Sequence, residues 1–315
     1  MRFHLQCIYL LLLLIVIATN AVLRNVSPQK HSRSKRAVVE TSKCKKKIEN
    51  DGMDLINYGI EALTVGEERP TGLFLDSLKF VFTILQNKKN ETKWRIADAL
   101  KPKYSHGYQS LLRKAKDPND LESTLVFMYT DDDIYGDLNY ALSQHKCTAK
   151  TLDQKDKAFA PYAAALLATL LYWGGVQGYD GVTYRMIGNV RGDIKSALKL
   201  YGKGNSVVFP AFSSSSNLID AAFNFIEDSS DKNILLIIDN STPSLWRPKD
   251  IQRYSKYRNE GEFLYPSVAK FRVLDKPVKK TYIQGTSYYE IRLQLDGQKL
   301  KENFLQKVRR VCRMN

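Results

Sequence analysis

Residues 173–186 read WGGVQGYDGVTYRM, and the periodicity of the apolar residues changes within this stretch. Upstream of it, apolar residues recur every three to four positions, which indicates helices. The longest and most apolar of these segments ends at Gly174 and Gly175, and glycine favours a helix end. The helices expected from this pattern cover residues 76–86, 94–100, 121–129, 134–144 and 155–173, the last of them largely buried.

Downstream of Gly178 the chain consists of short segments rich in β-branched and aromatic residues, separated by turn residues. Such segments predict strands. They cover residues 181–186, 205–212, 234–239, 261–264, 269–276, 280–283 and 287–295, with helices at 191–201 and 218–227. A run of helices followed by a run of strands predicts an α+β fold. No linker-like stretch divides the halves, so we expect a single domain in which an N-terminal helical lobe packs on a β-sheet core.

The first 36 residues have the features of a targeting and processing segment. A basic start, an apolar run over residues 8–17 and small residues up to Ala21 predict a signal peptide at residues 1–22. The apolar run is too short for a stable membrane span. The basic tetrapeptide at residues 33–36 is typical of a processing site, which would make residues 23–36 a propeptide and residues 37–315 the mature domain. A solvated charge run is the alternative interpretation.

The charge balance limits the classes of partner. The chain has a formal charge of +15, and residues 1–36 carry six Lys or Arg and no acids. The processed chain would keep 42 basic and 33 acidic residues, a charge of +9. This charge is spread along the chain, which supports attraction to acidic surfaces but argues against a nucleic-acid partner. The basic C-terminus lacks the hydrophobic tail of a lipid anchor, so we expect a secreted, extracellular protein without a membrane anchor.

Cysteines and sequons fit an exported chain. Cys7 would leave with the signal peptide, and Cys44, Cys147 and Cys312 would remain. Three cysteines allow at most one intramolecular disulfide, whose pairing stays open, although a bridge from Cys44 to Cys312 that ties the two ends is preferred. Sequons begin at residues 90 and 240, the second weakened by the proline that follows it, and both predict glycosylation sites.

Three motifs follow one another in the strand-rich half. The first is Arg185, which lies in the expected strand at 181–186. An arginine on a core strand needs a partner for its head group, and the planar guanidinium fork matches phosphate oxygens. Taken alone, the residue is more simply explained as an edge-strand arginine with its head group in water.

The second motif is a run of four serines at residues 213–216, after the apolar segment Val207, Val208 and Phe209. The simpler interpretation is helix capping, with Ser216 or Asn217 as the N-cap of the helix at 218–227. That interpretation is compatible with a role for Ser214, whose hydroxyl could donate a hydrogen bond that fixes the rotamer of a neighbouring carboxylate.

The third motif is Glu260-Gly261-Glu262, at the start of an apolar strand. In an extended segment side chains repeat every two residues, so both carboxylates would lean the same way and act on one substrate. One carboxylate under an anomeric carbon can stabilise an oxocarbenium-like transition state, and the other can hold and help deprotonate the nucleophile. Exposed glutamates at a strand start otherwise have no special role.

Other catalytic signatures are missing from the sequence. The segment Gly202-Lys203-Gly204 lacks the third glycine of a dinucleotide fingerprint, and there is no phosphate loop of the Gly-Lys-Ser/Thr type. After removal of residues 1–36, His106 and His145 are the only histidines. We therefore expect neither a metal site nor a Ser-His-Asp triad.

The order Arg185, Ser214, Glu260-x-Glu262 resembles the signature of the arginine-specific mono-ADP-ribosyltransferases, the exported eukaryotic group. Three longer segments strengthen the resemblance, which extends over about residues 121–276. They are Tyr129-Thr130 with residues 134–142, residues 204–222, and residues 257–273. The chain departs from the family pattern at Met186, where glycine is frequent, at Ser215, where threonine is usual, and in lacking the cysteines for a second disulfide.

The resemblance implies a co-substrate, NAD, and a protein partner that carries an arginine. It implies that Arg185 grips the NAD phosphates and that Ser214 orients Glu262, the catalytic glutamate, which would contact the ribose beside nicotinamide. Glu260 would position the acceptor guanidinium, and residues 246–259 would form the loop that meets the protein substrate. The expected activity is transfer of ADP-ribose from NAD to arginine, with release of nicotinamide.

Alternatives to this interpretation come from different classes of function. The same fold could act as a secreted NAD glycohydrolase, with water in place of arginine. It could also be a catalytically silent secreted binding protein that keeps the scaffold. A basic protein that binds heparin or a membrane surface would instead associate in a salt-sensitive way without NAD.

Overall fold

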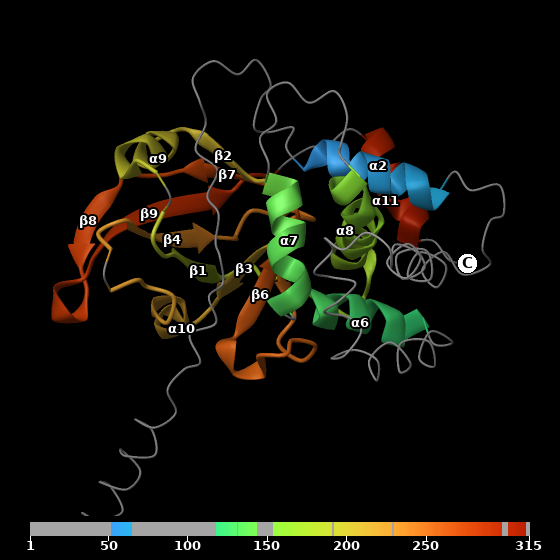
Figure 1. Cartoon of the computed structure of the whole chain (residues 1–315), viewed down its shortest axis with the longest axis horizontal. Helices are drawn as coiled ribbons and strands as arrows, with labels where there is room; N and C mark the ends of the chain where they lie inside the picture. The colour runs from blue at the N-terminus through green and yellow to red at the C-terminus, as the bar shows by residue number, and fades with distance from the viewer. Residues whose placement is uncertain are drawn as a thin grey trace, which may run out of the picture. The chain divides into compact units, whose positions relative to one another are not determined.

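In the computed structural model, a mixed sheet is formed by strands between residues 182 and 295 (Figure 1). The structure describes residues 52–64, 118–130, 132–143, 154–190, 192–228, 230–297 and 302–312, all of which belong to one compact unit, Lys35–Asn315. Within these residues the sheet has nine strands: β1 (Val182–Ile187), β2 (Ser206–Phe209), β3 (Ser213–Ser216), β4 (Asn233–Asp239), β5 (Lys249–Asp250), β6 (Glu262–Tyr265), β7 (Ala269–Val273), β8 (Val278–Thr281) and β9 (Ser287–Leu295).

The strand order is β2-β7-β9-β4-β1-β3-β6-β5, and β8 pairs with β9 beside this path. The pair β4–β9 is parallel, and the other described pairs are antiparallel. In this ladder β9 is the strand that connects β2 and β7 to the remaining strands. The order β4-β1-β3-β6 brings together three segments that carry the sequence motifs.

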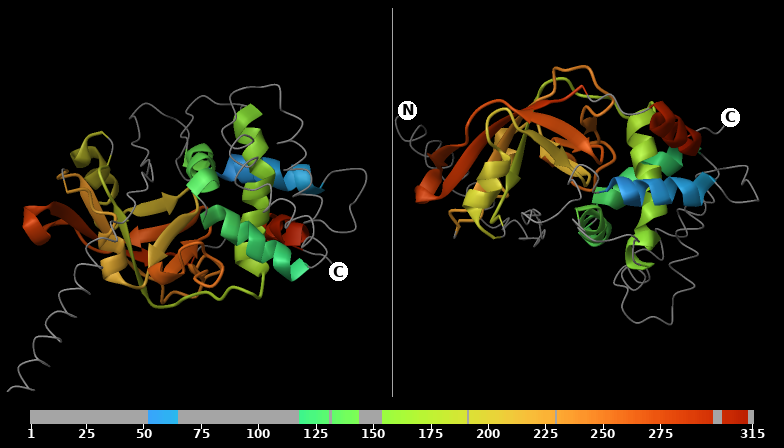
Figure 2. Two further views of the ribbon diagram at one scale, coloured as in Figure 1. Left: turned by 60° about the horizontal axis from the view of Figure 1, so that its bottom comes forward. Right: turned by 90° about the horizontal axis from the view of Figure 1, so that it is seen from above.

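The described helices are α2 (Met53–Thr64), α6 (Pro118–Thr130), α7 (Asp132–Ser143), α8 (Gln154–Tyr172), α9 (Ile194–Leu200), α10 (Ile219–Phe223) and α11 (Glu302–Cys312). Every residue of α8 from Phe159 to Leu171 is buried, because this helix is apolar on all sides. Helix α2 crosses α8 closely (Figure 2), and a Cβ atom added at Gly59 would lie 1.9 Å from the Ala160 carbonyl oxygen. Helix α11 also packs on α8, and the Tyr172 hydroxyl donates to the Leu305 carbonyl at 3.3 Å.

One hydrophobic core joins the helices to the sheet. It contains Leu125 and Tyr129 of α6, the apolar residues of α8, and Leu236, Phe271 and Ile291 of three strands. The α+β class and the packing of a helical lobe on a sheet are therefore confirmed. None of the described helices combines the length and the apolar character needed to cross a membrane.

Several boundaries differ from the expected ones. The strand expected at 205–212 ends at Phe209, before a proline that cannot donate to a ladder, and the serine run forms a separate strand, β3. The helix expected at 218–227 is the short α10, which ends at Phe223. The strand expected at 269–276 ends at Val273, and that at 280–283 is β8, two residues earlier. The edge strand β5 was not predicted.

Two helices were missed. Helix α2 lies before the first helix that was expected, and α11 occupies a segment that was interpreted as a charged chain end. The buried residues of α11 are Phe304, Val308 and Val311, and their spacing of four and three is the helical pattern. The expected helices at 76–86 and 94–100, the signal and propeptide segments, Cys44, Cys147, the Cys312 side chain, Asn90 and both histidines lie outside the described residues.

In the folded protein, the side chain of Asn240, the first residue of the second sequon, is buried and already makes hydrogen bonds. The Asn240 side chain is fully buried, donates to the Gly181 carbonyl at 2.8 Å, and accepts a hydrogen bond from the Tyr265 hydroxyl at 2.8 Å. A glycan on this amide would replace its buried contacts with a bulky polar group. The expectation that Asn240 is a glycosylation site is therefore wrong for the folded protein.

Candidate active site

Arg185 lies on an interior strand, so the interpretation as an edge-strand arginine is wrong. Strand β1 is bordered by β4 on one side and β3 on the other. The neighbouring residue Met186 points into a small apolar cluster with Ala222 and Leu235. Arg185 is half-buried on the other face, and its Nη1 donates to the Ser214 carbonyl. This bond aims the guanidinium toward the serine strand.

The serine run is a strand with a different acceptor for each hydroxyl. Strand β3 lies between β1 and β6, with Ser214 opposite Leu264 and Ser216 opposite Glu262. Ser214 Oγ donates to Glu262 Oε1 at 2.7 Å, and the other hydroxyls donate to backbone carbonyls: Ser213 to Ala211 at 3.2 Å, Ser215 to Phe263 at 3.2 Å and Ser216 to Glu260 at 2.8 Å. The predicted bond from Ser214 to a neighbouring carboxylate is present.

Helix capping by the serine run is wrong. The N-cap of α10 is Leu218, which has no side-chain capping bond. Ser216 Oγ accepts a hydrogen bond from the Leu218 amide at 2.9 Å, which is a local turn at the strand end rather than a cap. The serines are consecutive strand residues because β6 and β1 take up their backbone groups on both sides.

Glu262 is the most enclosed acid of the site. Its side chain is only 5% exposed, which requires hydrogen-bond partners for a carboxylate. Ser214 supplies one at Oε1, and Ser255 Oγ donates to Oε2 at 2.6 Å. Both carboxylate oxygens thus accept a hydroxyl. Sequence reasoning missed Ser255, because nothing in the basic loop around it marks this one serine as buried.

Glu260 and Glu262 do not lie on one extended segment, which corrects the argument from the period of two. Glu260 ends a short 3-10 turn, η2 (Arg258–Glu260), and Gly261 follows with φ of +56°. This left-handed conformation is one that glycine adopts readily. The turn is held by the Glu260 amide, which donates to the Tyr257 carbonyl at 3.2 Å, and by Ser216, which donates to the Glu260 carbonyl. Glu260 is half-buried, so the two acids differ in environment.

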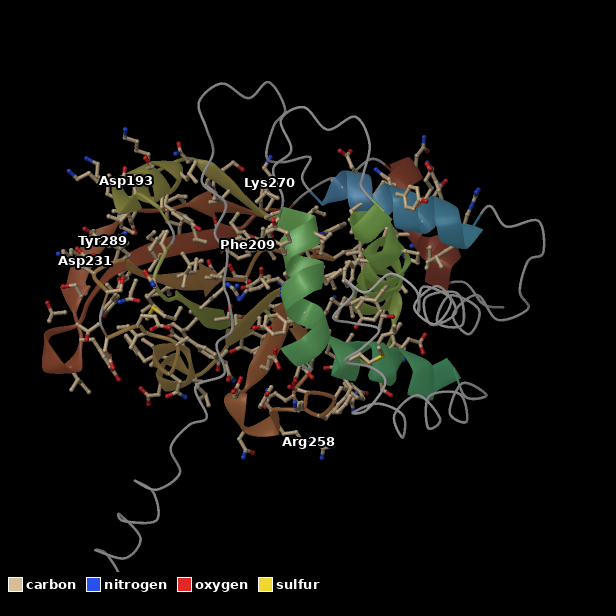
Figure 3. The ribbon with its side chains drawn as sticks, viewed as in Figure 1. Asp193, Phe209, Asp231, Arg258, Lys270 and Tyr289 are labelled. Atoms are coloured by element: carbon tan, nitrogen blue, oxygen red, sulfur yellow. The ribbon has the colours of Figure 1, made fainter. Side chains whose placement is uncertain are left out.

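The loop that precedes the glutamates is divided into a buried and an exposed part. Trp246 and Ile251, within the range expected to meet a protein substrate, belong to the core. The exposed side chains between 252 and 259 are Arg253, Lys256, Arg258 and Asn259. Figure 3 labels Arg258 in this loop, which leads into β6. These four residues, together with Asp250 on β5, are the part of the loop that another protein can reach.

The exposed part of the loop is anchored on the helical lobe. The Tyr254 hydroxyl donates to the Gly175 carbonyl at 3.1 Å, and the Tyr254 ring lies 4.9 Å from the Trp173 ring. The Lys256 amide donates to the Thr130 hydroxyl, at the end of α6, at 3.0 Å. These contacts fix the loop relative to both α6 and the end of α8.

The charges of Arg185 and Glu262 act on the same neighbour, Tyr129. Burial raises the pKa of the Tyr129 phenol well above its ordinary value. The hydrogen bond from Asn139 and the charge of Arg185 lower this pKa, whereas the charge of Glu262 raises it. Burial raises the pKa of Tyr201 to about 12, and Arg185 again opposes the shift. Arg185 and Glu262 thus have the buried Tyr129 as a common neighbour.

Several solved structures of other proteins are similar to this chain. No protein-family model matches the chain, and no curated protein sequence matches it. Exoenzyme S from Pseudomonas aeruginosa, solved with human 14-3-3 protein beta and bound to carba-NAD, is 20% identical over 67% of this chain and 94% of its own, with a TM-score of 0.40. The ADP-ribosyltransferase Vis from Vibrio splendidus, in complex with agmatine, is 20% identical over 58% of this chain and 75% of its own, with a TM-score of 0.38.

A eukaryotic protein is also among the similar structures. The mono-ADP-ribosyltransferase ART2.2 is 18% identical over 85% of this chain and 95% of its own, with a TM-score of 0.39.

Proposed function

We propose that the protein transfers the ADP-ribose of NAD to arginine side chains of a target protein and releases nicotinamide. The observation that carries this proposal is the Glu262 carboxylate, held at both oxygens by serine hydroxyls, together with Arg185, which bonds the carbonyl of one of these serines, Ser214. The resemblance of the Arg185, Ser214 and Glu260-x-Glu262 order to the transferase signature supports the same assignment.

The chemistry starts with cleavage of the bond between the ribose C1′ and the nicotinamide nitrogen, whose electron pair leaves with nicotinamide. A ribose cation develops, and a fixed carboxylate such as Glu262 stabilises this charge without reorganising. Arg185 has a planar fork of N–H donors suited to the diphosphate of NAD. Its bond to the Ser214 carbonyl would place that fork one strand away from Glu262.

The acceptor step forms a bond between C1′ and a guanidinium nitrogen of the target. Arginine is protonated in water, so one proton must leave the guanidinium during the attack. Glu260, half-buried on its own turn, is assigned to hold the guanidinium and accept this proton. The exposed Arg253, Lys256 and Arg258 favour a target whose arginine is surrounded by acidic residues.

The proposal also includes the export and the processing of the protein. Residues 1–22 would direct export, residues 23–36 would be removed at the basic site, and residues 37–315 would act outside the cell on an extracellular protein. N-terminal sequencing of the protein from the medium of expressing cells tests this part, and a mature start at Ala37 is expected. A start before residue 23 would contradict both cleavages.

The test of the activity uses residues 37–315, labelled NAD and agmatine, with nicotinamide release and agmatine adduct followed together. Glu262→Gln is expected to abolish transfer and NAD hydrolysis, because both require the ribose cation. Glu260→Gln is expected to lose transfer and keep hydrolysis. Nicotinamide without adduct would point to a glycohydrolase, and the absence of NAD binding and of both products would point to a silent binding protein.

A further inference from the structure

The hydroxyl of Ser255 joins the Glu262 carboxylate to the loop in front of it. The Ser255 side chain is only 2% exposed. Its Oγ lies 2.6 Å from Glu262 Oε2 and accepts a hydrogen bond from the Tyr257 amide at 3.0 Å. A serine hydroxyl has one proton, and the bond from the amide uses one of its lone pairs, so the proton is directed at the carboxylate.

A ring of hydrogen bonds fixes the position of this hydroxyl. The Ile251 amide donates to the Glu262 carbonyl at 3.2 Å, and the Ser255 amide donates to the Ile251 carbonyl at 2.9 Å. The bond from Ser255 Oγ to Glu262 Oε2 closes the ring. Ile251 is fully buried, so this ring has a rigid base in the core. Ser255 therefore cannot shift relative to Glu262 without breaking backbone hydrogen bonds.

The hydroxyl of Ser255 restricts the Glu262 carboxylate more than the hydroxyl of Ser214 does alone. The terminal torsion of a glutamate is broad, so one hydrogen bond at Oε1 leaves the plane of the carboxylate poorly defined. Ser214 holds Oε1 from β3, and Ser255 holds Oε2 from the loop. Two donors on different segments fix both the place and the plane of the carboxylate.

We propose that Ser255 is a positioning residue, which fixes the plane of the Glu262 carboxylate and makes it depend on the fold of the loop at residues 251–260. This inference rests on the proposed transfer of ADP-ribose. Ser255 does not need to touch NAD or the acceptor. Because the loop is anchored at Thr130 and Gly175, the carboxylate is connected to the helical lobe as well as to the sheet.

The experiment compares Ser255→Ala with the wild type in two assays, NAD hydrolysis without an acceptor and transfer to agmatine. Both values of kcat are expected to fall by the same factor, about 10- to 100-fold, because loss of a hydrogen bond to a charged group affects the bond cleavage common to both. The KM for NAD is expected to stay within about threefold, since Ser255 is not assigned to binding.

Matched variants separate positioning from folding. Ser213→Ala removes another buried hydroxyl, which bonds only the Ala211 carbonyl among the described contacts, and it is expected to keep wild-type kcat. Ser255→Thr keeps the donor and is expected to recover most of the activity. Ser255→Cys keeps the size with a weaker donor, so it gives an intermediate kcat should the alanine variant fail to fold. All rates are normalised to folded protein by circular dichroism.

The outcomes distinguish a failure of the positioning role of Ser255 from a failure of the proposed transfer of ADP-ribose. Wild-type kcat in Ser255→Ala, or loss of transfer with intact hydrolysis, would overturn the positioning role, and the second result would restrict Ser255 to shaping the acceptor loop. An inactive wild type would instead overturn the transfer function, because then Glu262→Gln and the wild type are alike. Equal losses in both assays support the inference.

Discussion

The phenol of Tyr129 donates a hydrogen bond of 2.9 Å to the carbonyl of Phe212, 83 positions further along the chain. The two rings also meet edge to face, with centroids 5.6 Å apart. Tyr129 belongs to the helical lobe, and Phe212 immediately precedes the serine strand. This contact therefore sets where β3 begins relative to α6.

Replacement of Tyr129 by phenylalanine should weaken both stability and activity. The change leaves the buried Phe212 carbonyl without its donor and is expected to lower the free energy of unfolding by about 1–3 kcal/mol. Activity per folded molecule is also expected to fall, because the start of β3 loses its anchor. Urea unfolding and the agmatine assay measure the two effects.

Tyr162→Phe is the matched control. The Tyr162 phenol is buried as well and donates to the Leu125 carbonyl at 2.6 Å, within the helical lobe. It should lower stability by a similar amount and leave kcat unchanged. Equal kcat values in the two variants would argue against a role of the Tyr129–Phe212 contact in shaping the site.

Arg185→Lys is expected to raise the KM for NAD at least about tenfold with a smaller change in kcat. Lysine keeps the charge but loses the planar fork, so one ammonium must replace several directed donors. Isothermal titration with NAD measures the effect directly. Arg272→Lys, which alters an exposed contact to Gln294 on the sheet, should leave NAD affinity unchanged, and an effect of similar size there would contradict the assignment.

Gly261→Ala should disrupt the turn between the two glutamates. A Cβ atom there would lie 2.7 Å from Asn217 Oδ1, and the φ of +56° adds backbone strain of about 1 kcal/mol. Gly204→Ala is the control, since it has a φ of +83° and no atom within 4 Å of the added Cβ. Both variants should lose stability in thermal unfolding, but only Gly261→Ala should lose activity. Full activity of Gly261→Ala would show that the turn tolerates displacement.

The buried Lys249 gives the stability of the protein a defined pH dependence. Burial, and then the charge of Arg247, lower the pKa of Lys249 from 10.5 to about 8. Between these values the unfolded chain holds a proton that the folded chain has lost, so the free energy of unfolding rises with pH in this window, by about 3 kcal/mol in total. Below about pH 8 both states are protonated, and the full cost of burying the charge is present.

Lys249→Met should remove this contribution. The difference in the free energy of unfolding between variant and wild type, measured by urea unfolding, should therefore become smaller from pH 8 to pH 10.5. The exposed Lys279, on β8, offers a control, because Lys279→Met changes no buried group. A difference between Lys249→Met and wild type that does not vary with pH would show that the lysine is solvated in the folded state.

The fold class could be predicted from the sequence because the apolar period changes at one place, after Gly178. Helix α8 has 13 consecutive buried residues, from Phe159 to Leu171, which are apolar or aromatic except for Thr169, and such a segment predicts a buried helix. Strand β3 could not be predicted, since four serines have neither strand propensity nor an apolar face. They are extended because Leu264 and Glu262 on β6 pair with them, which is a tertiary effect.

The sequence predicted that the candidate residues lie close together, but it did not predict their geometry. Arg185, Ser214 and Glu262 come together, as their order along the chain suggested. The relation of Glu260 to Glu262 was predicted from a period of two, and the left-handed Gly261 breaks that period. Ser255 has no periodic or compositional signal, because its burial depends on the ring of bonds through Ile251.

The position of β9 between β7 and β4 determines when the sheet of a growing chain can be completed. The strands β2 and β7 connect to β4 and the site strands through β9, so the described sheet stays in two pieces until residue 295 has left the ribosome. Pairing between β4 and β9 joins residues 55 positions apart, such as Asn233 and Tyr288, which makes it a slow step compared with local hairpins. A nascent chain thus carries Arg185, Ser214 and Glu262 before their supporting sheet is continuous, and under the proposed function it would acquire activity late in biosynthesis.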